Sequence, residues 1–341
     1  MPDPREKRVD LILQQLEELP TLPTVAMRVL EVTGDNSSSA RDVVGLISAD
    51  PALAARILQL IHRADSGVRS EIKSVERAVV LLGFDAVRSA ILAVSVFQNF
   101  SPQQLADGHF HRDEFWKHCV AVACCAELLA ESVRAANLPP SEVFICGLLH
   151  DLGKIALDAV LPKSFSRVVE AADLLRGNIA DIERNVIGLD HMVVGKRLAE
   201  RWHLPQLIRD CIWLHGQDPR ALPASVKNPR LVNLITLADQ IVREQHLGYS
   251  GNYTFTLSRE TLIEAAGLTP QIVESAIKKL VGRIEPRAKS LGLGTTSTTE
   301  LFQQALAQAR TPVFRQSRHV LEHRRNHVRR GGSSSRRRCQ W

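Results

Sequence analysis

Gly147-Leu148-Leu149-His150-Asp151-Leu152-Gly153-Lys154 places an imidazole, a carboxylate and an ammonium close together at the end of an apolar run. Around it the pattern predicts one helix, which begins after Pro139-Pro140 with Ser141 as its N-cap and ends near Gly153. On that helix His150 shares a stripe with Val143 and Cys146, so its side chain is expected to point inward. A buried polar group needs a partner, and we expect the rest of the chain to supply partners for this imidazole.

The composition is that of a soluble, helical protein: 45% of the 341 residues are hydrophobic and 5% are aromatic. A chain of this length can bury a sizeable core in one large or two smaller domains. The longest uncharged apolar runs, near 90–97 and 120–126, are too short to span a bilayer, and the charged residues 1–9 do not resemble a signal peptide. Six cysteines without a CxxC pair indicate reduced thiols, so we expect a cytoplasmic protein with no membrane partner.

Positive charge is concentrated at the C-terminus. The formal net charge is +6, but residues 315–341 contain nine Arg and one Glu, which leaves residues 1–314 at about −2. Nucleic-acid binding is therefore not expected of the body of the protein. The Arg-rich tail could contact the phosphates of nucleic acid or membrane, although a solvated, disordered terminus is the simpler expectation.

Hydrophobic periodicity and helix-capping residues predict an all-α fold. The expected helices span 5–19, 24–33, 40–48, 52–63, 74–82, 85–99, 112–136, 141–153, 163–175, 179–187, 190–203, 206–215, 230–246, 259–267, 270–291 and 299–309. Residues 247–257 are the only stretch that could hold a strand, and a loop is preferred there.

The expected helices fall into five segments along the chain. These are a lead-in helix at 1–17, an N-terminal helical lobe at 18–100, a second helical lobe at 101–245, C-terminal helices at 246–292 that pack on the second lobe, and a linker with the Arg-rich tail at 293–341. The first lobe shows no catalytic constellation, so the chemistry of the chain is expected in the second.

Five predicted helices each present one His or Asp on a stripe that should be buried. Besides His150, these residues are His118, His191, His215 and Asp239. Any one of them could be a core residue satisfied by a hydrogen bond. Burying all five would cost considerable free energy, and a shared cation would satisfy them together. The mixed nitrogen and oxygen donors favour one or two ions of Fe, Mn, Zn or Mg.

His118, then His150-Asp151, then Asp239 is similar to the H…HD…D signature of the HD superfamily of metal-dependent phosphohydrolases. The resemblance implies a multi-helix bundle in which these four side chains ligate one divalent metal ion. His191 and His215 resemble the extra histidines that bring in a second metal ion in the HD-GYP branch of that superfamily.

Glu114 and Lys154 also match positions that the HD-GYP branch uses, for metal and for phosphate contact respectively. As a catalytic group, Lys154 would stabilise charge on a phosphate, and Asp151 or Asp239 would orient an attacking water. The alternative for Lys154, weighted equally, is a solvated charge at a helix C-terminus. For Glu114, an exposed acid in the first helical turn is the preferred interpretation.

Over residues 18–245 the chain resembles the HDOD (HD-related output) domains more closely. The residues that carry this resemblance are Leu19-Pro20-Thr21-Leu22-Pro23, Ile47-Ser48-Ala49-Asp50-Pro51-Ala52-Leu53-Ala54, Ala78-Val79-Val80-Leu81-Leu82-Gly83, Gly147 to Lys154, Gly188-Leu189-Asp190-His191, Val194-Gly195, Trp202-His203-Leu204-Pro205 and Ala238-Asp239. It implies an all-α bacterial signal-transduction module, with signalling proteins or a nucleotide-type ligand as partners. Many such domains have lost metal ligands and act by binding.

Three functions are therefore considered. The first is a signalling output module that acts by binding, and the second is a metal-dependent phosphohydrolase of nucleotides or cyclic nucleotides. The third and weakest is a nucleic-acid-associated regulator that acts through its tail. After His215 the chain reads Gly216-Gln217-Asp218-Pro219 and has neither a second His nor a Gly-Tyr-Pro segment, which argues against hydrolysis of cyclic di-GMP.

Overall fold

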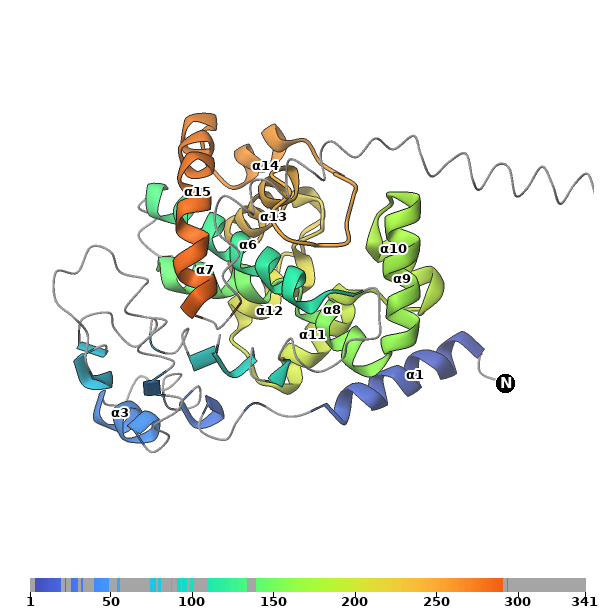
Figure 1. Ribbon diagram of the computed structural model, residues 1–341, viewed down its shortest axis with the longest axis horizontal. Coiled ribbons are helices and arrows are strands. Elements are labelled where there is room, and N and C mark those ends of the chain that lie inside the picture. The colour runs from blue at the N-terminus through green and yellow to red at the C-terminus, as the bar shows by residue number, and fades with distance from the viewer. Residues whose placement is uncertain are drawn as a thin grey trace, which may run out of the picture.

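The computed structural model describes residues 4–19, 40–48, 110–133 and 139–290, together with single residues and short pieces between 22 and 100 and residue 293. It is an all-α bundle, as predicted, and the described residues contain no strand (Figure 1). The helices are α1 (Pro4–Glu17), α3 (Ala40–Ser48), α6 (Arg112–Val133), α7 (Pro140–Leu149), α8 (Leu152–Val160), α9 (Pro162–Leu175), α10 (Ile179–Val186), α11 (His191–Arg201), α12 (Gln206–Leu214), the 3-10 helix η1 (Pro219–Ala221), α13 (Pro229–Glu244), α14 (Arg259–Ala265) and α15 (Pro270–Ser290).

Helix α6 is a central element of the described bundle. Its residues from His118 to Ala130 are buried almost without interruption, because α7, α13 and α15 pack against it on different sides. Two ion pairs hold α15 to it: Arg287 contacts the buried Glu127 at 2.6 Å, and Arg283 contacts Glu131 at 3.0 Å. Packing on several sides explains why this helix is apolar around most of its circumference.

The predicted single helix over 141–153 is wrong, because the chain turns a corner at His150-Asp151. Helix α7 ends at Leu149, and a new helix, α8, continues to Val160. Ser141 is not an N-cap, since α7 starts at Pro140 after Pro139 without a side-chain cap. The corner turns two consecutive side chains, an imidazole and a carboxylate, toward the same interior.

Gly153 permits a close helix contact. A Cβ atom at this position would lie only 1.8 Å from the carbonyl oxygen of His191, and one at Gly195 would lie 2.6 Å from Ile212 Cγ2. Helix α8 therefore crosses α11 at a distance that side chains would prevent. This contact brings Asp151 next to His191.

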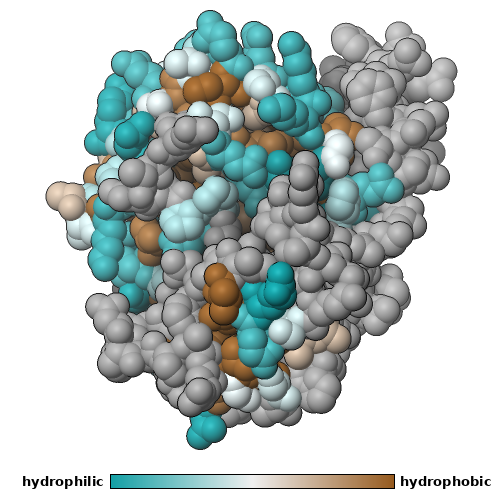
Figure 2. Space-filling view, turned by 90° about the vertical axis from the view of Figure 1, so that its left-hand side faces the viewer, coloured by the Kyte–Doolittle hydropathy of each residue, from teal (hydrophilic) through white to brown (hydrophobic). Residues whose placement is uncertain are grey.

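Most of the other predicted helices are confirmed to within a few residues, and 247–257 forms a loop. Only parts of the expected helices at 24–33, 52–63, 74–82 and 85–99 fall within the described residues, and the one at 299–309 and the Arg-rich tail lie wholly outside them. On the face shown in Figure 2, hydrophobic residues form small patches between hydrophilic ones.

Five cysteines are buried free thiols, as predicted: Cys119, Cys124, Cys125, Cys146 and Cys211. Cys339 lies outside the described residues. Within the part of the chain that the structure describes, no helix has the length and apolar character needed to cross a membrane.

Candidate metal centre

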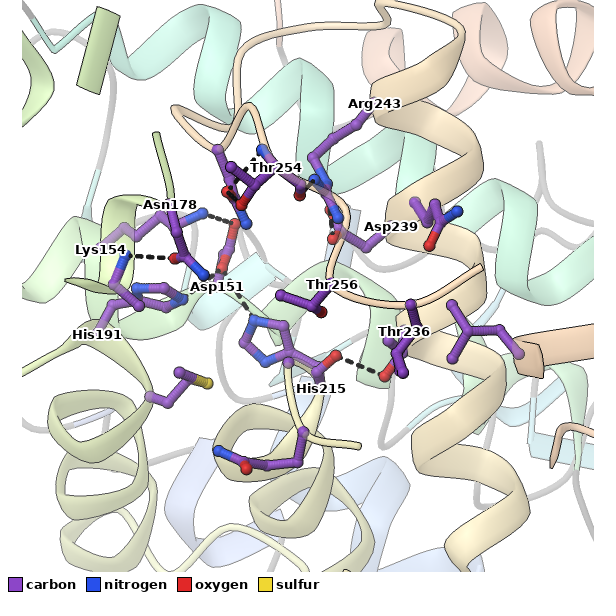
Figure 3. A pocket seen from close by; sticks show the side chains of 18 of the residues that line it. Asp151, Lys154, Asn178, His191, His215, Thr236, Asp239, Arg243, Thr254 and Thr256 are labelled. Atoms are coloured by element: carbon purple, nitrogen blue, oxygen red, sulfur yellow. Dashed lines mark hydrogen bonds and ion pairs between the residues drawn. The ribbon is translucent and has the colours of Figure 1, made fainter. Parts of the chain in front are cut away.

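The structure brings the six predicted metal ligands together. They come from five places in the fold: α6, the corner between α7 and α8, the first residue of α11, the end of α12, and α13. Figure 3 labels four of them, Asp151, His191, His215 and Asp239. The residues are His118, His150, Asp151, His191, His215 and Asp239, and each is at most 7% exposed. Their donor atoms form two groups that share Asp151.

We call the deeper group the inner site; it consists of His118, His150, Asp239 and the Oδ2 atom of Asp151. His118 Nε2 lies 3.2 Å from Asp239 Oδ1 and 3.9 Å from Asp151 Oδ2. His150 Nε2 lies 3.3 Å from the same Asp151 oxygen and 3.8 Å from Asp239 Oδ1. Two imidazoles and two carboxylates thus face one small space, which is the donor set of a divalent cation.

The second group, the outer site, consists of His191, His215 and the Oδ1 atom of Asp151. That oxygen lies 3.3 Å from His215 Nε2 and 3.5 Å from His191 Nε2. Asp190 is the N-cap of α11, since its side chain accepts a hydrogen bond from the backbone nitrogen of Val193. This cap begins the helix at His191 and so fixes the position of that ring.

The hydrogen bonds of the histidines test whether a cation fits. His150 Nδ1 lies 2.7 Å from Gly147 O, and His215 Nδ1 lies 3.1 Å from Ile212 O. A carbonyl oxygen can only accept, so each ring carries a proton on Nδ1, and in the neutral ring it is the unprotonated Nε2 that faces Asp151. A lone pair that faces a carboxylate is repelled unless a cation lies between them, and these residues therefore fit a metal ion.

Unpartnered buried atoms point to the same conclusion. His118 Nε2, His150 Nε2 and Asp151 Oδ1 are buried and have no hydrogen-bond partner. Orphaned polar atoms in a protein interior are costly, and here three of them come from neighbouring residues of one cluster.

Two positively charged side chains contact the carboxylates of the inner site. Lys154 Nζ lies 2.6 Å from Asp151 Oδ2, and Arg243 Nε lies 2.9 Å from Asp239 Oδ2. Burial works to raise the pKa of both carboxyls, but the charges of Lys154 at Asp151 and of Arg243 at Asp239 outweigh it. The pKa of each carboxyl lies below its ordinary value, so both are ionised at neutral pH.

Burial and nearby charge act on the histidines in opposite directions. Burial lowers the pKa of His118 and of His215. Burial also opposes the protonation of His150, but the charge of Asp151 outweighs it, and the pKa of His150 lies above its ordinary value. The neutral form that a metal ion requires is therefore favoured at His118 and His215.

The centre opens into a polar pocket of about 220 Å³ (Figure 3). The outer site lies in its wall, whereas His118 and His150 are set behind it. The polar residues that line the pocket around the centre include Lys154, Asn178, Arg184, Gln217, Thr236, Gln240, Arg243, Asn252, Thr254 and Thr256. Cationic and amide side chains beside a candidate metal centre can bind an anionic oxygen group such as a phosphate.

Lys154 is buried, so the alternative of a solvated charge at a helix C-terminus is wrong. It is 3% exposed and lies near the start of α8, where Nζ contacts Asp151 and also donates to Ser250 O at 2.8 Å. Glu114 lies outside both groups of the centre and pairs with Lys117 at 2.5 Å. It is a first-turn acid, as the preferred interpretation had it, but it is half-buried rather than exposed.

Three features of the site were not predicted from the sequence. Arg243 follows Asp239 by four residues on α13, a spacing that indicates an ion pair. The loop 247–257 covers the pocket, because Lys154 donates to Ser250 O and Arg243 donates to Thr254 O at 2.7 Å. Glu183, behind His191, gives no signal in the sequence beyond one polar residue on a short helix.

The fold and the buried His and Asp cluster define an HD-type helical protein. The family model of the HDOD domain matches residues 19–217, which is more than half of the sequence, and the chain belongs to this family. An HDOD domain protein of unknown function from Geobacter sulfurreducens is 27% identical, with a TM-score of 0.66 over 83% of this chain and 99% of that one.

Two further solved structures share the fold. A protein of Shewanella amazonensis, provisionally named a phosphohydrolase, is 23% identical over 82% of this chain and 97% of that one, with a TM-score of 0.63. A protein of Marinobacter aquaeolei, provisionally named a signal transduction protein, is 22% identical over 85% of this chain and 66% of that one, with a TM-score of 0.65.

A curated relative, an uncharacterized protein of Treponema pallidum, is 24% identical over 234 residues. The match covers 68% of this chain but only 44% of the relative's length. The chain therefore spans less than half of the curated protein that it matches.

Proposed function

We propose that this chain is a signal-transduction module of the HDOD type that binds one or two divalent cations, Fe, Mn, Zn or Mg, in its second lobe. The inner site would hold one cation through His118, His150, Asp151 and Asp239, and the outer site a second through Asp151, His191 and His215. The observation that carries the proposal is that His150 and His215 both turn Nε2 toward the Asp151 carboxylate while their Nδ1 atoms contact backbone carbonyls. Signalling proteins or a nucleotide-type ligand are the proposed partners.

Metal content tests this proposal directly. The full chain is purified without added chelator, and its metal is quantified per chain beside His150→Ala, Asp239→Ala and the exposed control His111→Ala. We expect a stoichiometric metal ion in the wild type and the control, and its loss in the two site variants. A wild-type protein that is folded but holds no Fe, Mn, Zn or Mg, even after incubation with each ion, would contradict the proposal.

The pocket favours a second candidate function, a metal-dependent phosphohydrolase. A divalent cation in the centre would supply Lewis acidity toward a phosphoryl oxygen and lower the pKa of water. Lys154 and Arg243 lie at the pocket wall, where they can neutralise charge on a phosphate. Asp239 is held at Oδ2 by Arg243, and its Oδ1 faces the inner site, where it would orient a water bound to the cation. The relative of this fold provisionally named a phosphohydrolase supports considering this chemistry.

Hydrolysis is tested with the Mn-loaded full chain and a panel of nucleotides, cyclic nucleotides and simple phosphate esters. We expect turnover that is lost in Asp151→Asn and reduced in Lys154→Met, with the metal content of each variant measured in the same samples. Metal bound without turnover of any phosphate ester would leave the binding module as the function and exclude the hydrolase.

A further inference from the structure

Glu183 is a fully buried carboxylate that contacts His191 from behind the outer site. It lies on α10 with 0% of its surface exposed. Its Oε2 accepts a hydrogen bond from the backbone nitrogen of His191 at 2.8 Å and lies 2.6 Å from Nδ1 of the same residue. One carboxylate oxygen therefore fixes both the backbone and the ring of His191.

No Lys or Arg side chain pairs with this carboxylate among the residues that the structure describes. The neighbouring Arg184 contacts Asp181 and Asp190 instead, and the other oxygen of Glu183, Oε1, has no hydrogen-bond partner. An ionised carboxylate buried beside a neutral ring is costly. This free-energy cost falls when a cation binds on the opposite side of the imidazole, because the ring then lies between a positive and a negative charge.

The contact also determines where His191 carries its proton. Glu183 Oε2 accepts a hydrogen bond donated from Nδ1, and in the neutral ring this leaves the unprotonated Nε2 to face Asp151 Oδ1 at 3.5 Å. The two rings of the outer site lie side by side, with the centroids of His191 and His215 5.6 Å apart. Both rings thus present Nε2 to the same carboxylate oxygen.

Without Glu183 the outer site would be short of negative charge. The inner site contains oxygens of two carboxylates, Asp151 and Asp239, whereas the outer site has only Asp151 Oδ1. His150 and His215 direct Nδ1 at neutral carbonyls, and His191 directs it at a charged group. Glu183 therefore adds a second negative charge to the outer site through the ring of His191.

We propose that Glu183 is a positioning residue that makes the outer site able to hold a second divalent cation. The inference rests on the proposed cation centre and goes beyond it. It states that Glu183, which contacts no cation itself, determines whether the centre holds one ion or two. Carboxylates behind metal-bound histidines raise metal affinity by about 10- to 100-fold in known sites, and a similar contribution is expected here.

The test is a Co²⁺ titration of the metal-stripped full chain, followed by the visible absorption of the ion and by direct metal analysis. The variants are Glu183→Gln, which removes the charge but keeps an acceptor oxygen, His191→Ala, and the exposed control Glu274→Gln. We expect two Co²⁺ per chain in the wild type and the control. In Glu183→Gln the second affinity should fall by about 10- to 100-fold while the first is unchanged. The double variant Glu183→Gln/His191→Ala should lose no more than His191→Ala alone.

Several outcomes would overturn the inference. Unchanged affinity for the second ion in folded Glu183→Gln would do so, as would a wild type that holds only one ion and keeps it in the variant. A wild type without any bound ion would overturn the cation centre as well, so the two failures can be told apart. If Glu183→Gln does not fold, ¹⁵N NMR of the wild-type imidazoles decides: a proton on Nε2 of neutral His191 contradicts the proposal.

Discussion

The inner and outer sites share one carboxylate, Asp151, but differ in how the protein balances their charge. At the inner site, Lys154 and Arg243 contact the carboxylates directly, and both histidines are set behind the pocket wall. At the outer site, Asp151 Oδ1 has no hydrogen-bond partner, and the carboxylate of Glu183 contacts His191 from behind.

This difference shows that one cluster can contain two distinct electrostatic environments. In the inner site a bound cation must compete with an ammonium for Asp151 Oδ2, whereas no Lys or Arg of the described residues forms an ion pair through Asp151 Oδ1 at the outer site. The ligands of the outer site line the pocket together with Asp239, whereas the two histidines of the inner site do not.

The largest effect is expected from Asp151→Asn, because this carboxylate belongs to both sites. Outer ligands of metal centres contribute about 10- to 100-fold in affinity, so loss of a direct shared ligand should cost more than ~100-fold at each site. Lys154 would lose its charged partner while buried, which should lower the free energy of unfolding by ~3 kcal/mol or more. Metal analysis and urea unfolding measure the two effects.

The matched control is Asp113→Asn, whose side chain is 58% exposed in the first turn of α6. It should change neither metal content nor stability by a measurable amount. Retention of one tightly bound ion in Asp151→Asn would show that the two sites do not share this ligand.

Next in size is Gly153→Ala, which should weaken the outer site more than the inner one. The new Cβ would overlap the carbonyl oxygen of His191, so α11 must move away from α8 and carry its histidine with it. Overpacking of this kind costs about 1 to 3 kcal/mol, and thermal unfolding with a Co²⁺ titration would measure it. Gly282→Ala in α15 is the control, since a Cβ there meets nothing within 4 Å. Equal loss at both sites would contradict the expected asymmetry.

The role of Gly153 shows which parts of this site could be predicted from the sequence. His118, His191 and Asp239 stand on regular apolar stripes, and periodicity alone indicated that they face one interior. The corner at His150-Asp151 was not predicted, because Gly153 was interpreted as the end of a helix, which is a common role of glycine. Gly153 instead lies inside α8 in close contact with residue 191, and no local pattern indicates a partner so far along the sequence.

Glu183 and Arg243 differ in the same way. Arg243 follows Asp239 by one helical turn, so its ion pair could have been predicted from spacing. Glu183 lies on another helix than His191, and its contact exists only because α10 and α11 are packed together. Sequence patterns place side chains on faces of helices, whereas the pairing of buried charges across helices depends on tertiary structure.

A smaller effect is expected from Lys154→Met, which should strengthen Co²⁺ binding at the inner site but weaken any phosphate hydrolysis. Removing the ammonium frees Asp151 Oδ2, so the inner site should bind Co²⁺ about tenfold more tightly, as expected when a charge-assisted contact of about 1.4 kcal/mol no longer competes. Any phosphate hydrolysis should fall, because the pocket loses a cation. Weaker Co²⁺ binding in the folded variant would show that Lys154 supports the inner site.

The smallest effect concerns the thiols beside the two sites, which should take no part in metal binding. Cys119 follows His118, and Cys211 lies one turn before His215; burial raises the pKa of both thiols well above the ordinary value. Burial raises the pKa of Cys125 to about 12. A raised pKa keeps the thiol protonated, so the rate of modification of these buried thiols should not rise between pH 7 and pH 9, whereas an exposed thiol with a pKa near ~8.5 becomes more reactive over that range.

A thiol reagent added to the native chain tests this, with the Cys339→Ser variant used to isolate the five buried residues. We expect no modification in the native state with or without Co²⁺, and full modification after unfolding in urea. A thiol that reacts in the native metal-free protein and is protected by Co²⁺ would mean that sulfur is among the donors. The comparison of the two sites would then have to include the negative charge of a thiolate, in addition to the charge that Glu183 supplies at the outer site.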